Sequence, residues 1–390
     1  MSKSNVKVRP SSEALPFEHL AAEHDTPLFV LDLDKIRQQF RALSSALPDV
    51  ELYYAIKSLP NVDVVAALRD EGAKFDIATT GEIEMIRPLG LNPRHTLHSH
   101  PMKRRKDIQA ALRFGCTTFV VDNIDELEKF RPFRHRVGLL IRVGFKNPNA
   151  VVDLARKFGC PLAEVSAIID QAEEWGIHIK GLSFHVGSQC ENAEHHAQAI
   201  HACDELIRSQ WQDRGRVLSI LDIGGGFPGA YSDHCMAIDE FCAPIRDALA
   251  ALPERVRVLA EPGRFISSAG GTSIARVMGK ARRSDGKMWY FLDDGVYGSY
   301  SGVIFDHANY PITVFSDSGD RQSSVLSGPT CDSIDVICED AEIPELEIGD
   351  LVVGEQMGAY TVASATDFNL FDRAKIITVD STRIEHCKIA

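Results

Sequence analysis

The fold of this chain is decided by one stretch, Asp222-Ile-Gly-Gly-Gly-Phe-Pro-Gly229. It follows an apolar run at 217–221 that is typical of a buried strand. Three consecutive glycines leave their backbone N–H groups accessible to an anion, because no side chain stands in the way. The spacing also fits the G-x-G-x-x-G pattern of dinucleotide sites, in which the glycines open the first βαβ unit. The place of the run in the fold must decide between a phosphate cradle and a dinucleotide turn.

Short apolar runs alternate with helical patterns from about residue 50 to residue 265. Strict alternation predicts parallel strands, and eight units in about 215 residues fit a (β/α)8 barrel. An open doubly wound sheet is the alternative architecture. The eight expected strands are 52–56, 74–78, 96–99, 118–121, 138–143, 179–184, 218–223 and 257–260.

The glycine run follows the seventh expected strand, with Pro228 inside the motif. Phosphate sites in barrels typically use the loops after strands seven and eight, so this position favours a phosphate cradle over a dinucleotide turn. Catalytic residues of barrels come from the ends of several strands. The polar residues at the expected strand ends are Lys57, Asp76, His98, Asp122, Arg142, His185 and Glu261.

The pattern changes after Arg264, where strand-like runs at 275–278, 289–292, 324–327, 351–353 and 376–379 lack long helical patterns between them. This arrangement is typical of an all-β domain. We expect the segment 27–32 to add a strand to it. The predicted domains are a barrel at 33–265 and a β-sandwich or β-barrel formed by 1–32 together with 266–390.

The formal net charge of −13 argues against nucleic acid and anionic membranes as partners. No stretch approaches the roughly 20 apolar residues that span a bilayer. The N-terminus also lacks the apolar core of a signal peptide. The nine cysteines are scattered without a C-x-x-C pair, which indicates reduced thiols in a cytoplasmic protein.

Three histidines at helical spacing, His195, His196 and His201, raise the question of a metal site. No cysteine or acid set completes a group of ligands around them. We therefore expect no metal here and interpret these histidines as a solvated helix face.

Lys57 ends an aromatic-rich strand, where loss of hydration would lower the pKa of its amine and prepare it for Schiff-base chemistry. A strand-end lysine that reaches solvent is the alternative. A Schiff-base lysine and a phosphate cradle in one barrel point to pyridoxal phosphate. Glu261 would then pair with the pyridine nitrogen and Arg264 with the phosphate. Without the other motifs, Glu261 and Arg264 could equally form a structural ion pair at the rim.

His185 could stack on a flat cofactor ring, with Ser188 on the phosphate; a packed core histidine is the alternative. In the β domain, Cys331 is a candidate acid or nucleophile, and Asp332 is a candidate partner for an amine. Asp306 is a second acid of this kind, and two carboxylates would bind the end of a diamine well. The alternative is a tight turn around a buried cysteine.

Taken together, these motifs resemble the fold type III pyridoxal-phosphate decarboxylases, in particular the eukaryotic-type ornithine decarboxylase branch. The resemblance runs from about Leu28 to Phe371 and is specific because it rests on many motifs in order. They are Tyr54-Ala-Ile-Lys57, Phe75-Asp-Ile-Ala-Thr-Thr-Gly-Glu-Ile83, Lys157-Phe-Gly159, Phe184-His-Val-Gly-Ser188, the Asp222 to Gly229 stretch, Glu261-Pro-Gly-Arg264, Asp294-Gly-Val-Tyr-Gly-Ser299, Phe305-Asp-His-Ala308, 328–335 and Met357-Gly-Ala-Tyr-Thr361.

The resemblance implies a head-to-tail homodimer with two shared active sites, each holding pyridoxal phosphate. Cys331, a proton donor, and Asp332 would come from the partner subunit, while Asp306 joins Asp332 on the substrate's distal ammonium. Phe305 and Phe368 would line the substrate pocket. Lys157 and Asp335 would form a salt bridge across the dimer. The implied cofactor-binding residues are Lys57, Asp76, Arg142, His185, Ser188, Gly224, Gly225, Gly226, Glu261, Gly263, Arg264 and Tyr360. Glu82 would join Asp76 and Arg142 in a polar shell near the lysine and the ring.

The resemblance further implies decarboxylation of the basic amino acid L-ornithine to putrescine and carbon dioxide. The chain departs from the usual ornithine pattern at Phe305, where tyrosine is common, and at Leu370, which replaces a glycine. A changed pocket lip would admit L-lysine as a second substrate, since one methylene is worth only about 1–3 kcal/mol of discrimination. The alternatives are a lysine-preferring enzyme, a diaminopimelate decarboxylase, which usually has glutamate at the place of Asp332, and a non-catalytic regulatory homologue.

Overall fold

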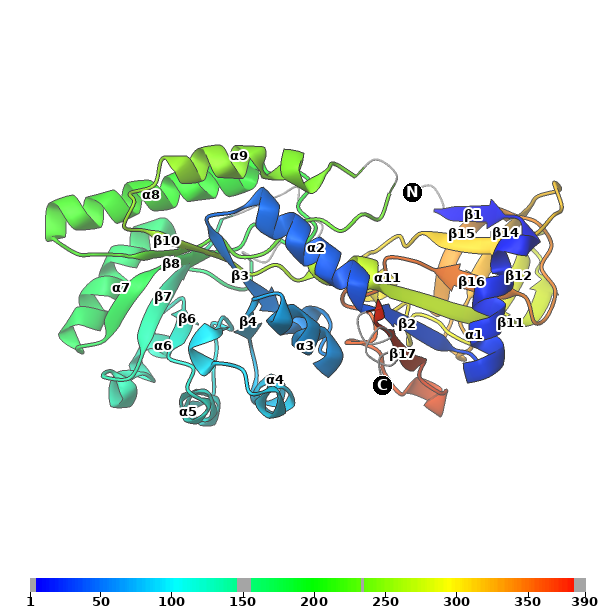
Figure 1. Cartoon of the computed structure of the whole chain (residues 1–390), viewed down its shortest axis with the longest axis horizontal. Helices are drawn as coiled ribbons and strands as arrows, with labels where there is room; N and C mark the ends of the chain where they lie inside the picture. The colour runs from blue at the N-terminus through cyan, green and yellow to red at the C-terminus, as the bar shows by residue number, and fades with distance from the viewer. Residues whose placement is uncertain (1–4, 146–155, 233–234, 382–390) are drawn as a thin grey trace. The chain divides into compact units, whose positions relative to one another are not determined.

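The computed structural model describes residues 5–145, 156–232 and 235–381. The chain divides into two compact units, and the colour in Figure 1 follows the residue number. The barrel unit combines 37–228 with 236–264, and the β unit combines 1–36, 229–235 and 265–390. Helices α2 (Leu33–Ala46) and α10 (Arg264–Ser267) each contain a point where the chain passes from one unit to the other. The domain boundaries expected from the sequence stay a prediction.

The barrel unit contains a closed barrel of eight parallel strands, in the order β10-β3-β4-β5-β6-β7-β8-β9. The (β/α)8 barrel expected from the alternating pattern is therefore confirmed, and the open doubly wound sheet is wrong. Each expected strand has its counterpart. The strands are β3 (Val50–Ala55), β4 (Lys74–Ile77), β5 (Thr96–His98), β6 (Thr118–Val121), β7 (Gly138–Val143), β8 (His178–Phe184), β9 (Ile220–Asp222) and β10 (Arg257–Ala260).

A layer of packed side chains fills the barrel interior: Tyr53, Leu97, Val120, Leu140, Ile220 and Leu259. Because side chains alternate along a strand, the neighbouring positions face the surrounding helices. Polar side chains cap the N-termini of several of these helices. Asn61 and Asn123 each accept backbone N–H bonds at a helix N-terminus. The helices are α3 (Val62–Asp70), α4 (Thr80–Ile86), α5 (Arg105–Phe114), α6 (Ile124–Glu128), α7 (Leu162–Glu174), α8 (Glu194–Arg214) and α9 (Ile238–Ala250).

The β unit contains a nine-stranded sheet with the strand order β1-β13-β16-β11-β12-β14-β15. Strand β2 (Leu28–Asp32) pairs antiparallel with β11 and parallel with β17, so the strand expected at 27–32 is confirmed. The other strands are β1 (Val6–Arg9), β11 (Gly271–Arg282), β12 (Met288–Leu292), β13 (Ile312–Phe315), β14 (Gln322–Ser327), β15 (Val336–Ile343), β16 (Leu351–Gly354) and β17 (Lys375–Val379).

Several of the described elements of the β unit were not expected from the sequence. Strands β1 and β13 have only four residues, too few to show a clear alternation. Strand β15 carries Glu339, Asp340 and Glu342 on exposed positions, and these charges make its apolar pattern difficult to recognise in the sequence. The unexpected helices are α1 (Leu15–His24) and the single turn α11 (Gly302–Phe305).

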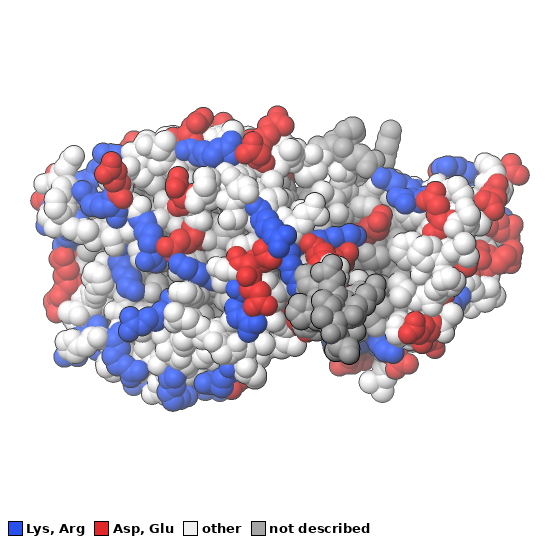
Figure 2. Space-filling model, in the orientation of Figure 1, with Lys and Arg blue, Asp and Glu red and all other residues white. Residues whose placement is uncertain are grey.

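Charge is distributed unevenly over the surface. On the face in Figure 2, basic side chains gather at the lower left, although the whole chain has a net charge of −13. Helix α5 carries Arg105, Lys106 and Arg113 on exposed positions. Within the described residues no helix is both long and apolar enough to cross a membrane. The eight described cysteines are free thiols, and Cys387 lies outside the described residues.

Candidate active site

Lys57 and Asp76 form an ion pair at the carboxyl ends of neighbouring barrel strands. Lys57 lies in a short turn directly after β3, and its Nζ donates to Asp76 Oδ2 at 2.6 Å. The lysine side chain is 42% exposed, whereas the Asp76 side chain is fully buried. A buried carboxylate therefore orients an amine that remains accessible. The other oxygen, Asp76 Oδ1, has no hydrogen-bond partner among the described residues.

A buried pair of acids, Asp222 and Glu261, lies at the ends of β9 and β10. Burial raises the pKa of Glu261 well above its ordinary value, and the neighbouring Asp222 raises it further. Burial also raises the pKa of Asp222 to about 6. Glu261 Oε1 and Asp222 Oδ2 lack hydrogen-bond donors within the described chain. The pair therefore holds a proton and presents a buried carboxyl oxygen that a positively charged ring N–H would satisfy.

The glycine run forms a tight turn in which side chains have no room. Gly224 and Gly226 have positive φ angles of 66° and 105°, a backbone region that L side chains rarely adopt. A Cβ on Gly225 would lie 2.8 Å from the Glu261 carbonyl oxygen and 3.0 Å from His185 Nε2. The N–H groups of Gly225 and Gly226 make no hydrogen bond to the described parts of the chain. The turn thus presents two unpaired backbone donors, as an anion site requires.

Arg264 and Ser188 lie together in the same unit. The guanidinium of Arg264 donates to Ser188 Oγ from Nε at 3.2 Å and from Nη2 at 3.0 Å. Arg264 is buried, and in this contact its positive charge meets a neutral hydroxyl. Gly263 precedes Arg264 in the loop after β10. A cation and a hydroxyl in this arrangement suit a phosphate group.

His185, at the end of β8, is held by its own loop, since Gly187 N donates to His185 Nδ1 at 3.0 Å. Burial lowers the pKa of His185 well below its usual value, with Arg142 and Lys57 adding repulsion. The imidazole is therefore neutral. Burial also lowers the pKa of Arg142, whose guanidinium lies 5.5 Å from the ring centre of Phe158.

Glu82 belongs to a capping box at the start of α4. Its carboxylate accepts the backbone N–H groups of Thr79 and Ala78, and Thr79 Oγ1 in turn accepts Glu82 N. Burial raises the pKa of Glu82, and the Asp76 charge raises it further. The same side chain that starts the helix thus lies within the electrostatic reach of the Lys57–Asp76 pair.

A second cluster of expected site residues lies in the β unit. Tyr297 Oη donates to Asp332 Oδ2 at 2.5 Å, and the rings of Tyr297 and Phe368 stack with centroids 4.6 Å apart. This hydrogen bond lowers the pKa of the Asp332 carboxyl. Cys331 is exposed, and its backbone N–H donates to Asn369 Oδ1 at 3.0 Å. Asp332 and Phe368 are thus brought together through Tyr297.

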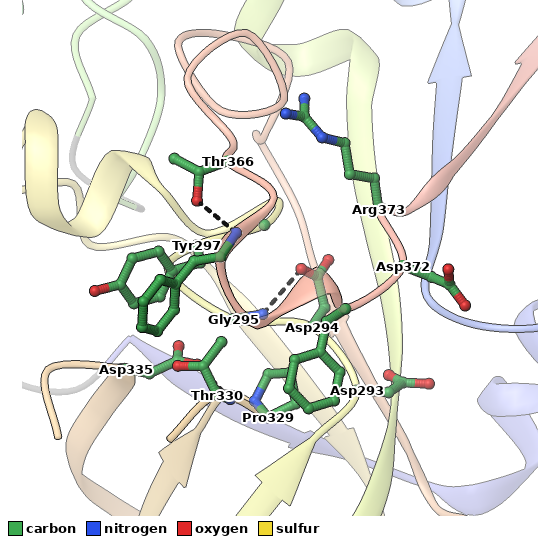
Figure 3. Close-up of a pocket in the computed structure, with 13 residues that line it drawn as sticks. Asp293, Asp294, Gly295, Tyr297, Pro329, Thr330, Asp335, Thr366, Asp372 and Arg373 are labelled. Carbon is green, nitrogen blue, oxygen red and sulfur yellow. Dashed lines mark hydrogen bonds between the residues drawn. The ribbon is translucent and has the colours of Figure 1, made fainter. Parts of the chain in front are cut away.

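Figure 3 shows the pocket beside this cluster, lined by Tyr297, Thr330 and Asp335 among others. Asp335 is buried and accepts backbone N–H groups from Val296 and Thr330, both at 2.9 Å. This carboxylate fixes the turn that carries Cys331. Lys157 belongs to the barrel unit, and the salt bridge expected between Lys157 and Asp335 across a dimer stays a prediction.

Three further expected residues also belong to the β unit. Asp306 caps the C-terminus of α11, and its neighbour Phe305 is 59% exposed. Tyr360 has a positive φ of 54°. Their roles toward substrate and phosphate stay predictions.

One interpretation of the sequence is wrong, and two residues were missed. His196 does not lie on a solvated helix face: it is fully buried, its Nε2 is 3.1 Å from the Gly225 carbonyl oxygen, and Phe227 packs against it. Helical spacing alone could not show that this face of α8 is covered. Asp222 and Tyr297 lie within motifs of the sequence, but the motifs assigned neither of them a function.

The fold and these contacts define a class, namely barrel enzymes in which a lysine, a buried acid and a glycine turn can hold a phosphorylated aldehyde cofactor. The family model described as "Pyridoxal-dependent decarboxylase, pyridoxal binding domain" matches residues 33–268. The chain belongs to this family of pyridoxal-dependent decarboxylases, and its cofactor is pyridoxal phosphate.

Known proteins resemble the chain over nearly its whole length. A lysine/ornithine decarboxylase of Selenomonas ruminantium is 33% identical, with 92% of this chain and 91% of that protein covered. An antizyme inhibitor 2 of Xenopus laevis is 34% identical over 89% of this chain and 80% of that protein. The crystal structure of a lysine/ornithine decarboxylase from Vibrio vulnificus complexed with putrescine shares 52% identity and a TM-score of 0.89, covering 95% and 99% of the two chains.

The residues of the barrel unit fit the cofactor. The unpaired oxygen of Glu261 matches the need of a pyridine N–H, and the glycine turn has two N–H groups for phosphate oxygens. Lys57 supplies an accessible amine, and Asp76 orients it.

Proposed function

We propose that this chain decarboxylates L-ornithine to putrescine and carbon dioxide, with secondary activity on L-lysine to give cadaverine. The observation that carries the proposal is the set of Lys57, Glu261 and the glycine turn in one barrel. The names of the relatives support the substrate class. The order of preference, ornithine before lysine, rests on the sequence motifs alone.

Pyridoxal phosphate, when bound, accepts the electron pair that carbon dioxide leaves behind. Lys57 would hold the cofactor covalently and later release the product, with Asp76 orienting its amine. Glu261 would accept the pyridine N–H through its buried Oε1, which has no donor among the described residues. Neutral His185 would stack on the ring, and Arg142 would complete the polar shell. The phosphate would be held by Ser188, Gly224, Gly225, Gly226, Gly263, Arg264 and Tyr360.

The substrate residues of the proposal come from the β unit. Asp332 and Asp306 would bind the distal ammonium by charge-assisted hydrogen bonds, which suits a diamino acid without a second carboxylate. Phe305 and Phe368 would pack against the aliphatic chain. Cys331 would return a proton to Cα after decarboxylation.

We further propose a homodimer in which Cys331 and Asp332 complete the partner's active site. Large apolar side chains are exposed in the segments around Cys331: Ile334 is 51% exposed and Leu370 is 86% exposed. Phe371 and Phe305 are exposed as well. Exposed apolar side chains that gather near functional residues mark an interaction surface. Scattered free thiols and the metabolic role of the products support a cytoplasmic location in polyamine biosynthesis.

The relative named antizyme inhibitor 2 makes a regulatory role the second candidate. Measuring carbon dioxide release by the cofactor-loaded protein separates the two. L-ornithine, L-lysine, L-arginine and meso-diaminopimelate would be offered side by side, with Lys57→Ala as the inactive control. The proposal predicts release from ornithine, less from lysine, and none from the control. Turnover of diaminopimelate would show that Asp332 is misassigned, and no release from any substrate would favour the regulatory role.

A further inference from the structure

Each carbonyl of the glycine turn is held by a different part of the barrel unit. The Gly224 carbonyl accepts Glu261 N at 2.7 Å, and the Gly226 carbonyl accepts Cys190 N at 2.9 Å. The Gly225 carbonyl lies 3.1 Å from Nε2 of His196, in the first turn of α8. Two of the three anchors are therefore backbone groups, and His196 is the one side chain among them.

The anchors set the direction of the free N–H groups. In a trans peptide the C=O and the following N–H point in opposite directions, and no cis bond is present in this turn. When His196 holds the Gly225 carbonyl, the Gly226 N–H must point away from α8. In the preceding peptide the Gly224 carbonyl accepts Glu261 N, so the Gly225 N–H must point away from the Glu261 backbone. Both unpaired donors of the turn are oriented through their carbonyl partners.

The surroundings of His196 select the tautomer that this role requires. The ring is fully buried and packs against Phe227 and Phe241, with centroid distances of 5.4 Å and 6.1 Å. Nδ1 has no hydrogen-bond partner within the described residues. Burial lowers the pKa of His196 to about 4, so the ring is neutral. A neutral imidazole has one N–H, and only at Nε2 does it meet an acceptor.

We propose that His196 is a positioning residue for phosphate binding: it donates to the Gly225 carbonyl and thereby holds the Gly226 N–H toward the anion. This inference rests on the proposed use of the glycine turn as the phosphate cradle. A residue that only stabilised the barrel would affect every ligand of the site alike. A residue that orients the Gly226 N–H affects the ligands that carry a phosphate.

The test compares two ligands that differ only in the phosphate, pyridoxal phosphate and pyridoxal, by titration of the full-length apo-protein. His196→Phe keeps an aromatic ring but has no donor. We expect it to weaken pyridoxal phosphate binding roughly three- to tenfold, the range for one lost hydrogen bond, while pyridoxal binding stays unchanged. His196→Gln retains an N–H donor and should recover most of the loss. His201→Phe, at an exposed position on the same helix, is the matched control and should change neither affinity.

The proposal is overturned if His196→Phe binds pyridoxal phosphate as the parent does, or loses affinity for both ligands equally. His196→Met, an adaptable side chain without a donor, replaces the phenylalanine variant if the latter does not fold. If both donor-free variants fail to fold, His196 acts in folding and the positioning role is wrong. Failure of the proposed cradle itself looks different, because the parent would then bind pyridoxal as tightly as its phosphate.

Discussion

Lys57 Nζ lies 2.6 Å from Asp76 Oδ2, so the lysine proposed to bind the cofactor is paired with a fully buried carboxylate. The pair joins the ends of two adjacent strands, β3 and β4, which are hydrogen-bonded up to Ala55 and Asp76. The rigid barrel thus fixes the carboxylate, and the carboxylate orients the amine. This relationship links the fold to the proposed chemistry.

Substitution of Gly225 should weaken cofactor binding. In Gly225→Ala the new methyl group would meet the Glu261 carbonyl and the His185 ring, at a typical overpacking cost of about 1–3 kcal/mol. We expect pyridoxal phosphate affinity to fall roughly tenfold or more. The affinity is measured by absorbance titration. Gly279→Ala, where a Cβ meets nothing within 4 Å, is the control. Equal affinity of both variants would show that the turn does not bind the phosphate.

The apo-protein should lose stability as the pH rises because of Glu261. Its carboxyl ionises near the ordinary pKa in the unfolded chain but well above that value in the folded one. Between these two values the folded state binds more protons, so the free energy of unfolding falls with rising pH. Glu261→Gln lacks this titration. The difference in Tm, variant minus parent, should therefore increase from pH 5 to pH 8, and a constant difference would contradict the raised pKa.

Asp332→Asn should weaken substrate use and leave cofactor binding intact. Removing one partner of a close charge pair typically costs about 2–5 kcal/mol, so kcat/KM for L-ornithine should fall roughly 30-fold or more. The affinity for pyridoxal phosphate should not change. Steady-state kinetics and a cofactor titration check the two statements, with Asp320→Asn on an exposed loop as the control. An unchanged kcat/KM would remove Asp332 from the substrate pocket.

Mixed dimers should test whether the active site is shared. Lys57→Ala and Cys331→Ala are each expected to be inactive, since one lacks the amine and the other the proton donor. If the site is built from two subunits, a mixture of the variants forms hybrid dimers with one intact site. Up to about a quarter of the parent activity should then return, as random pairing of subunits places one complete site in half of the dimers. No recovery, with mixed dimers shown to form, would count against shared sites.

Most of the barrel could be predicted from the sequence, because parallel strands buried on both faces give continuous apolar runs with polar ends. The run at 138–143 coincides with β7, for example. The β unit was harder to predict. Strand β1 alternates apolar with basic residues over only four positions, and it pairs with β13, which is far away in the sequence. Such pairing leaves no local signal.

The residues of the candidate site could be predicted where they belong to a recognisable sequence motif at the end of a strand. Lys57 and Asp76 lie 19 residues apart in sequence, yet both stand at strand ends, and the barrel brings them together. The side-chain hydrogen bonds of Tyr297 and His196 go to Asp332 and to the Gly225 carbonyl. Neither contact follows from spacing, because each joins segments whose proximity only the folded chain establishes. His196 is buried, whereas His201 on the same helix is exposed, and their spacing in the sequence does not reveal this difference.

The most direct test of the account is to reduce the cofactor-loaded protein with borohydride and to locate the modified residue by peptide mass spectrometry. The account predicts a stable pyridoxyl group on Lys57 and on no other lysine. It also predicts that Lys57→Ala loses both the label and the absorbance band of the lysine-bound cofactor. A label on a different lysine, or a reducible band retained by Lys57→Ala, would contradict the assignment of the active site.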